Sequence, residues 1–120
     1  MKKVIVTGGN GFIGSNLIKF LIQKNYFVIN IDKNKYSKNS YILKGLKKKD
    51  YIFYKLDINN KKKIYKILQK FKPQAIFNLA AETHVDRSID SPKEFINSNI
   101  CGVFNLLEAI REYKKKIRLI

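Results

Sequence analysis

The 120-residue sequence has no tryptophan, one methionine, one cysteine and two prolines. It contains no run of eighteen apolar residues, so a helix that crosses a membrane is not expected. The single cysteine, Cys101, excludes an internal disulfide and fits a reducing cytoplasm. We expect it to be a small buried packing residue in a helix rather than a reactive thiol. Because Met1-Lys2-Lys3 leads directly into an apolar strand, we expect no signal peptide and a cytoplasmic protein.

Acidic residues are also scarce, since 9 Asp and Glu face 25 Lys and Arg and the formal net charge is +16. Only three of the basic residues are arginines, whose planar side chain is the usual reader of bases and phosphates. The lysines are spread over positions 33–38, 44–49, 61–63 and 114–116, and they are not interleaved with aromatic residues that would make a platform for base stacking. We therefore expect solvated lysines that attract anionic cofactors and substrates in general, and no specific nucleic-acid partner.

Three of the six glycines, Gly8, Gly11 and Gly14, separate an apolar β-branched stretch from an amphipathic one. Residues 3–7 are typical of a buried parallel strand. In a strand–turn–helix unit, the first glycine permits a tight turn, the second lets a pyrophosphate approach, and the third lets the helix pack on the strand. The free N–H groups and the dipole at the start of the helix then bind phosphates. The spacing therefore predicts a dinucleotide site.

An acid follows the next apolar run, which covers residues 26–31 and ends at Asp32. Its distance from the glycines is that at which dinucleotide-binding folds place a carboxylate on the adenosine ribose. Such a carboxylate accepts from two ribose hydroxyls and repels a 2′-phosphate, which favours NAD over NADP. Lys33 and Lys35 weaken this preference, because a cation beside the acid tolerates a phosphate. The alternative is an ordinary βαβ unit with no ligand.

Strands and helices alternate along the whole chain. Apolar runs predict strands at about 3–7, 27–31, 51–56, 75–79 and 116–120, and periodicity predicts helices at about 12–24, 60–71 and 92–113, with a helical turn around 42–46. This alternation predicts one α/β domain over residues 1–120, a Rossmann-type doubly wound parallel sheet with strand order 3-2-1-4-5. The chain is expected to end at Ile120, within the fifth strand.

The helix faces are predicted from the same spacing. The inner face of the first helix is assigned to Leu17, Ile18, Leu21 and Ile22, that of the second to Ile64, Ile67, Leu68 and Phe71, and that of the third to Ile96, Ile100, Val103, Leu107 and Ile110. Ser91 is expected to cap the third helix, with Glu94 completing a capping box.

Two further strand ends carry candidate binding residues. Asp57 and Ile58 follow the third strand, where an acid can accept from the adenine amino group and an apolar side chain can pack on the ring. Helix capping by Asp57 or Asn59 is the alternative. The fourth strand leads into the small residues Ala80 and Ala81, which let a cofactor approach. The polar residues that follow, His84, Asp86 and Arg87 among them, fit either a site or a salt-linked turn.

Five segments together, TGGNGFIGSNLI, IDK, LDI, NLAAETHVDRSID and FINSNICGVFNLLEA, resemble the N-terminal part of the dTDP-glucose 4,6-dehydratases. These belong to the extended short-chain dehydrogenase/reductases. The glycines, Asp32 and the alanine pair are shared across that superfamily, whereas AAETHVDRSI and FINSNICG are more specific to the dehydratase branch. The resemblance covers residues 2–120. Another extended member, such as a UDP-sugar epimerase or dehydratase, is the alternative within this superfamily.

The resemblance implies NAD as cofactor, a nucleotide sugar (dTDP-glucose) as substrate and a homodimeric parent enzyme. In that family NAD takes hydride from the sugar's C4, water is eliminated across C5 and C6, and the hydride returns to C6. It implies cofactor contacts for Gly8, Gly11, Phe12, Ile13, Gly14, Asp32, Lys33, Lys35, Asp57, Ile58, Leu79, Ala80, Ala81 and Ser98. It implies substrate contacts for Thr83 and His84, and no metal.

One departure concerns the catalytic groups. Members of the family carry a Thr-Asp-Glu cluster after the fifth strand and a Tyr-x-x-x-Lys pair beyond it, and neither occurs here in the right place. Tyr51 and Lys55 have the second spacing, but they fall on a predicted strand. We therefore expect the catalytic residues to lie beyond Ile120, and the 120 residues to be an inactive fragment of a longer enzyme. A stand-alone dinucleotide-binding or regulatory module is the alternative of another class.

Overall fold

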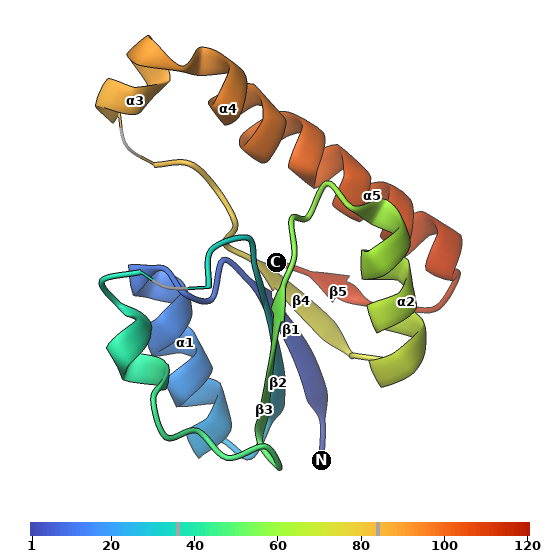
Figure 1. Ribbon diagram of the computed structural model, residues 1–120. Coiled ribbons are helices and arrows are strands. Elements are labelled where there is room, and N and C mark those ends of the chain that lie inside the picture. The colour runs from blue at the N-terminus through green and yellow to red at the C-terminus, as the bar shows by residue number, and fades with distance from the viewer. Residues whose placement is uncertain (36, 84) are drawn as a thin grey trace.

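The computed structural model describes residues 1–35, 37–83 and 85–120 and contains a single five-stranded parallel sheet (Figure 1). Its strands are β1 (Lys3–Thr7), β2 (Phe27–Asp32), β3 (Tyr51–Lys55), β4 (Ala75–Asn78) and β5 (Arg118–Leu119). They run in the order β3-β2-β1-β4-β5, and every neighbouring pair is parallel. The predicted Rossmann-type fold and its strand order are confirmed.

The fifth strand is shorter than the predicted range 116–120, since β5 includes neither Lys116 and Ile117 nor Ile120. Ile120 nevertheless continues the pairing with β4. Its N–H donates to Ile76 O over 2.9 Å, and its backbone oxygen accepts from Asn78 N over 2.8 Å. Its side chain is 60% exposed, so this residue completes the edge of the sheet through its backbone and adds little to the core.

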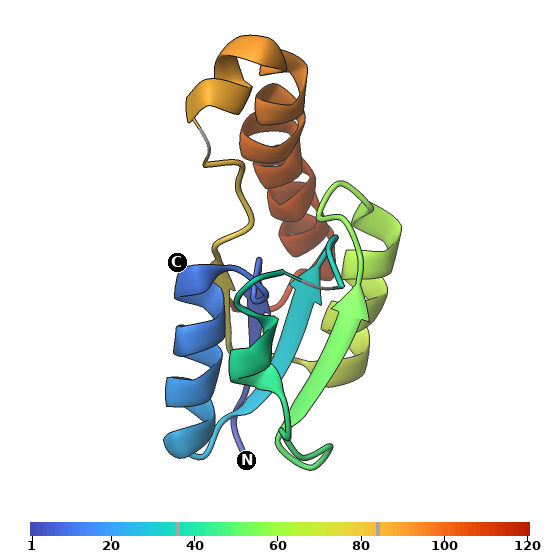
Figure 2. The same cartoon turned by 60° about the vertical axis from the view of Figure 1, so that its left-hand side comes forward.

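Helices cover both faces of the sheet (Figures 1 and 2). One face carries α1 (Phe12–Gln23) and the short 3-10 helix η1 (Ser40–Leu43), and the other carries α2 (Lys61–Phe71) and α5 (Gly102–Tyr113). Between β4 and α5 the chain forms α3 (Val85–Asp90), α4 (Pro92–Ile96) and the π-helical turn η2 (Asn97–Cys101). These three elements, which we call the helical arm (residues 85–101), extend past the carboxyl ends of the strands.

Alternating side chains of the strands build one apolar layer on each face of the sheet. Val4, Val6 and Val28 pack with Ile18 and Leu21 of α1, whereas Leu17 and Ile22 are partly buried beside them. Ile5, Ile29 and Ile76 pack on the other face with Ile64, Ile67, Leu68 and Leu106. The predicted inner faces of the first two helices are therefore confirmed, with Phe71 partly buried.

The predicted inner face of the third helix is correct for Ile110, which packs against the core, but wrong for most of its other members. Ile96, Ile100 and Leu107 are 50%, 63% and 47% exposed, and the residues that α5 buries are Gly102, Leu106, Ala109 and Tyr113. The helix is apolar on two sides, so periodicity alone does not select one. Small residues decide the packing, because a β-carbon on Gly102 would lie 2.6 Å from Ile58 Cδ1. The π turn, which the sequence did not predict, also breaks the regular helical spacing.

Local details differ from expectation at several places. Ser91 occupies the N-cap position of α4, but its side chain makes no capping hydrogen bond, so the predicted capping box is wrong. The cap of α2 is Asn60, whose side chain accepts from Lys63 N, rather than Asp57 or Asn59. Cys101 is only half-buried. The helix α3 was not predicted, and the turn expected around 42–46 is η1, a few residues earlier.

Candidate functional site: the crevice at the carboxyl ends of the strands

A tight turn of residues 8–14, the glycine turn, joins β1 to α1 at the carboxyl end of the sheet. Gly8 has φ +69°, a conformation that glycine adopts without steric cost. A β-carbon on Gly14 would lie 2.3 Å from the backbone oxygen of Gly8, so only glycine lets the helix start this close to the strand. Gly11 N donates to Gly8 O over 3.1 Å and closes the turn.

The first turn of α1 offers unpaired backbone donors to this crevice. Gly11 is the N-cap residue, and no side chain among the described residues caps the helix. By helix geometry the N–H groups of Phe12, Ile13 and Gly14 have no partner within the helix. The Phe12 and Ile13 side chains are 69% and 68% exposed, so they do not bury these donors in the core. Together with the helix dipole, the donors form an anion-binding terminus.

Asp32, the last residue of β2, lies directly beside the glycine turn. Its Oδ2 accepts from Asn10 N over 3.0 Å, and its Oδ1 accepts from Asn34 N over 2.9 Å. Each carboxylate oxygen keeps a further lone pair for a ligand hydroxyl. The two backbone donors thus fix the orientation of the carboxylate, and they also fix the segment that carries Lys33 and Lys35.

The exit of β4 forms another wall of the crevice. Thr7 Oγ1 donates to Asn78 Oδ1 over 2.6 Å and accepts from Ala80 N over 3.1 Å. A β-carbon on Gly8 would lie 2.7 Å from Leu79 O and 2.8 Å from Ala80 N. The structure therefore brings Leu79 and Ala80 against the glycine turn, and Ala81 follows them in the chain.

The exit of β3 lies next to Asp32, because Leu56 N donates to Asp32 O over 2.9 Å. The following residue, Asp57, is exposed, and its Oδ1 accepts from Asn59 N over 2.9 Å. Ile58 is 4% exposed and packs against Gly102, so most of its side chain is already covered by α5.

Three side chains link β2 to the chain that follows β4. Lys33 Nζ lies 3.0 Å from Glu82 Oε1 and 3.4 Å from Ser98 Oγ. The hydrogen bond from Lys33 to Glu82 raises the pKa of the lysine, although partial burial opposes this shift. Glu82 N and O in turn pair with the Asn99 side-chain amide, so Glu82 is held from both sides.

Of the two residues expected to contact substrate, Thr83 is exposed after this link, and His84 lies outside the described residues. The alternative of a salt-linked turn also falls on His84 and on the Arg87 side chain, which is likewise not described. Lys35 is exposed, and its backbone oxygen accepts from Asn10 Nδ2.

Sequence reasoning missed the polar residues beneath the crevice, Asn10, Asn30 and Tyr51. The available signal was Asn30, the one amide in the otherwise apolar run of β2 before Asp32.

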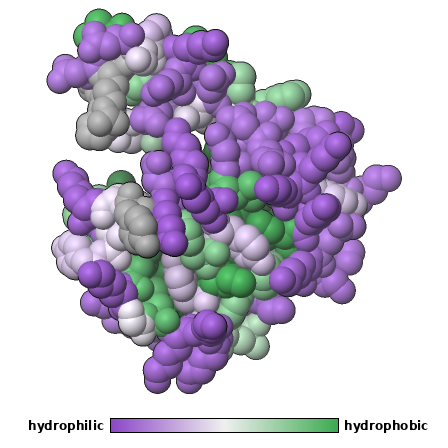
Figure 3. Space-filling model, in the orientation of Figure 1, coloured by the Kyte–Doolittle hydropathy of each residue, from purple (hydrophilic) through white to green (hydrophobic). Residues whose placement is uncertain are grey.

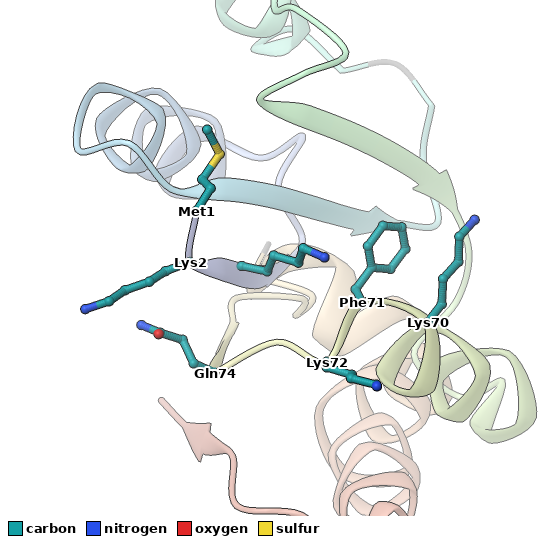
Figure 4. Close-up of a pocket in the computed structure, with 7 residues that line it drawn as sticks. Met1, Lys2, Lys70, Phe71, Lys72 and Gln74 are labelled. Carbon is teal, nitrogen blue, oxygen red and sulfur yellow. The ribbon is translucent and has the colours of Figure 1, made fainter.

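Two surface hollows lie away from these residues. One, of about 450 Å³, is lined by Met1, Lys2, Lys3, Lys70, Phe71, Lys72 and Gln74 near the amino ends of the strands (Figure 4). The other, of about 380 Å³, lies between β3 and α2. Figure 3 shows hydrophilic residues over most of the visible face, with an apolar patch exposed between them. Neither hollow includes a residue expected to bind cofactor, so the candidate site is the open crevice above the strands.

The described residues do not bring together three His, Cys, Asp or Glu side chains that could hold a metal ion. In the part of the chain that the structure describes, no helix has the length and apolar character needed to cross a bilayer.

Residues 5–120 match the sequence model of the GDP-mannose 4,6 dehydratase family. The chain belongs to this family.

Similar proteins within the family include the dTDP-glucose 4,6-dehydratase of Haemophilus influenzae, 44% identical over 115 residues, which are 94% of this chain and 34% of that protein. Among solved structures, the dTDP-glucose 4,6-dehydratase of Bacillus anthracis in complex with NAD is 34% identical with a TM-score of 0.81, covering 99% of this chain and 36% of that one. The UDP-glucose 4-epimerase of Thermotoga maritima with UDP-glucose is 32% identical with a TM-score of 0.81, covering 97% and 36%. The chain thus spans about a third of the length of these relatives.

Proposed function

We propose that the chain is the NAD-binding part of a nucleotide-sugar 4,6-dehydratase. The observation that carries this proposal is the meeting of three groups in one crevice. These are the uncapped start of α1, the glycine turn, and the Asp32 carboxylate held by two backbone N–H groups. The helix start is suited to the pyrophosphate of a dinucleotide, and the carboxylate to the two hydroxyls of its adenosine ribose.

The remaining residues surround this pair. Leu79, Ala80 and Ala81 would line the cofactor channel, and Asp57 would accept from the adenine amino group. Ile58 would offer only the edge left exposed by Gly102. Lys33, Lys35 and Ser98 lie on the adenosine side, and Thr83 and His84 are proposed to face the sugar.

For the parent enzyme we propose dTDP-glucose as substrate, with oxidation at C4, loss of water across C5 and C6, and return of the hydride to C6. The support is the 44% identity to a dTDP-glucose 4,6-dehydratase, together with the segment Ala80–Ile89 that carries the resemblance to this branch. The second candidate is a UDP-sugar epimerase, which the structural likeness to the Thermotoga maritima enzyme favours. The product of a longer protein that includes this chain would distinguish the two.

The 120 residues by themselves are proposed to bind cofactor without turnover. Proton transfer requires an acid and a base within hydrogen-bond reach of the sugar, and the Tyr-x-x-x-Lys and Thr-Asp-Glu groups do not occur between β4 and Ile120. The acid and the base of the parent enzyme are proposed to lie in the part of the longer relatives that this chain does not span. Tyr51 lies on β3 with its hydroxyl bonded to Asn30, so it cannot serve as the base.

Calorimetric titration of the purified chain with NAD tests the proposal. We expect binding that Asp32→Ala weakens at least about tenfold, because a ribose with two hydroxyls loses its acceptor. Asp50→Ala, which removes a carboxylate at the opposite end of the sheet, is the matched control and should leave binding unchanged. Equal affinity of the wild type and Asp32→Ala would contradict the proposed site. Incubation with NAD and dTDP-glucose should give no 4-keto-6-deoxy product above a no-enzyme control.

We also propose that the parent enzyme is a cytoplasmic lyase and a homodimer. The support for the dimer is the outer side of the helical arm and α5, where Ile96, Ile100, Phe104 and Leu107 are exposed. A row of apolar side chains on this scale is typical of surfaces that contact another protein surface. Light scattering of the longer protein tests this, and replacing Ile100 and Phe104 by serine should shift a dimer towards monomer.

A further inference from the structure

Asn10 is buried in the glycine turn, and hydrogen bonds connect it to several other segments of the chain. It lies within the glycine turn and is 3% exposed. Its backbone N–H donates to Asp32 Oδ2, and its Nδ2 donates to the backbone oxygens of Asn34 and Lys35. Its Oδ1 accepts from Asn30 Nδ2 over 3.0 Å. Both ends of its amide are thus used to join the glycine turn to β2 and to the segment after it.

A second layer of polar groups holds Asn10 in place. Asn30 is fully buried in β2, and its Nδ2 also donates to the Tyr51 hydroxyl over 2.9 Å. The Ser37 hydroxyl donates to the backbone oxygen of Asn10. A β-carbon on Gly9 would lie 2.1 Å from Asn30 Oδ1, so the turn rests directly on this amide. Asn30 Oδ1 itself has no partner among the described residues.

Burial of these amides is a cost that an apolar core would avoid, since an unpaired buried polar atom is unfavourable. Apolar side chains fill the rest of this layer, with Val4, Val6 and Val28 around the same strands. The paired amides of this polar cluster fix one arrangement of the turn relative to β2 and the segment after it. Its contacts end at residues 32–37, the segment that carries Asp32, Lys33 and Lys35.

That segment contains opposing signals for the cofactor. The Asp32 carboxylate repels a 2′-phosphate, whereas the Lys33 and Lys35 ammonium groups attract one. Which of them faces the ribose depends on the backbone path after Asp32, and Asn10 holds that path through the carbonyls of residues 34 and 35. We infer that Asn10 is the positioning residue that sets the preference for NAD over NADP, an inference that rests on the proposed NAD binding.

The test compares dissociation constants for NAD and for NADP in the wild type, Asn10→Ala and Asn16→Ala. Asn16 is a matched control, because it is exposed and its amide bonds only to Phe12 O, 2.8 Å away. We expect Asn10→Ala to raise the dissociation constant for NAD and to change that for NADP little, so that the ratio of the NADP constant to the NAD constant falls about tenfold. A merely structural role would weaken both cofactors by the same factor. Ser37→Ala removes a single hydrogen bond to Asn10 and should shift the ratio in the same direction by a smaller factor. This variant replaces Asn10→Ala in the test if Asn10→Ala does not fold.

Amide hydrogen exchange of Asn34 provides a readout that needs no cofactor. Its N–H donates to Asp32 Oδ1, and it should exchange faster in Asn10→Ala but not in Asn16→Ala. An unchanged ratio of the two dissociation constants, with NAD binding intact in the wild type, overturns the inference alone. A wild-type chain that binds neither dinucleotide overturns the proposed function and the inference with it.

Discussion

The glycine turn and the helical arm lie at the same end of the sheet but are built in opposite ways. The turn sits between β1, β2 and β4, and its backbone is closely packed. Buried Asn10 bonds from the turn to the segment after β2, and buried Ser15 bonds back to Gly11 O. In the arm, neither α4 nor the π turn buries a residue, and Ile89, Ile96 and Ile100 are exposed. The contacts that fix the turn therefore all come from within the described chain, whereas the arm presents apolar surface that nothing in the described chain covers.

The groups proposed to bind the dinucleotide and those proposed to bind the sugar differ in how firmly this chain holds them. Groups suited to holding a dinucleotide are fixed by contacts inside the chain, as Asp32 is by two backbone donors. Thr83, which is expected to meet the sugar, is exposed and immediately precedes the arm along the chain. Cofactor binding should therefore be a property of this chain, and substrate binding should need further surface.

Two adjacent leucines of α5 provide the largest expected contrast. Leu106→Ala should lower the free energy of unfolding by about 3 kcal/mol, because it opens a cavity in the core beneath the sheet. Leu107→Ala, on the outer side, should lower it by less than about 0.5 kcal/mol. Urea unfolding of both variants measures the difference. Equal losses would mean that the outer side is already covered, which would contradict the comparison.

A pair of glycines tests how closely the turn is packed. Gly14→Ala should cost about 2.5 kcal/mol, since its β-carbon would lie 2.3 Å from the backbone oxygen of Gly8. At Gly45, which lies in a loop, a β-carbon would meet nothing within 4 Å, but φ is +79°. Gly45→Ala should therefore lower the free energy of unfolding by only about 1 kcal/mol, the cost of a left-handed backbone at a non-glycine residue. Thermal unfolding measures both variants. A melting temperature of Gly14→Ala as high as that of Gly45→Ala would contradict the close packing of the turn.

Tyr51→Phe tests the polar layer under the turn. Loss of the bond from Asn30 should cost about 1 kcal/mol at neutral pH. Burial raises the pKa of Tyr51, so the fold favours the neutral phenol. The stability that the neutral phenol contributes is fully present below the pKa of about 10 that tyrosine has in the unfolded chain. It is lost as the pH rises through the higher pKa of the folded protein. The stability gap between wild type and variant should therefore narrow above about pH 10, and a constant gap would show that the phenol is not buried.

The smallest effect is expected where the two regions meet, at the ion pair between Lys33 and Glu82. Because the pair is partly exposed, a double-mutant cycle with Lys33→Met and Glu82→Gln should give a coupling below about 1 kcal/mol, decreasing with added salt. A coupling well above this, or one insensitive to salt, would mean that the arm is anchored more firmly than its exposure indicates.

The sequence predicted the sheet well because strand and helix periodicities are local signals. The strand order and the places of Gly8, Gly14 and Asp32 followed from apolar runs and one spacing rule. The inner face of α5 could not be predicted, since Leu106 and Leu107 are equally apolar and tertiary contacts, such as that of Gly102 with Ile58, decide between their faces.

The polar network was also beyond local reasoning. Asn10 and Asn30 lie 20 residues apart, and their amides meet only once β1 and β2 are paired. Nor did the sequence indicate that Lys33 would reach across to Glu82, 49 residues later. Contacts of this kind depend on the assembled sheet, and they are the ones that position the candidate site.

The most direct test of the account is an amide NMR titration of the 120-residue chain with NAD. We predict chemical-shift changes at Gly8, Gly11, Phe12 and Ile13, at Asp32 and Asn34, and at Ala80. No change is expected at Lys2, Lys72 and Gln74, which line the hollow near the opposite end of the strands. Shifts confined to that hollow, or no saturable shift at the glycine turn, would contradict the claim that this turn and the Asp32 carboxylate form a dinucleotide site.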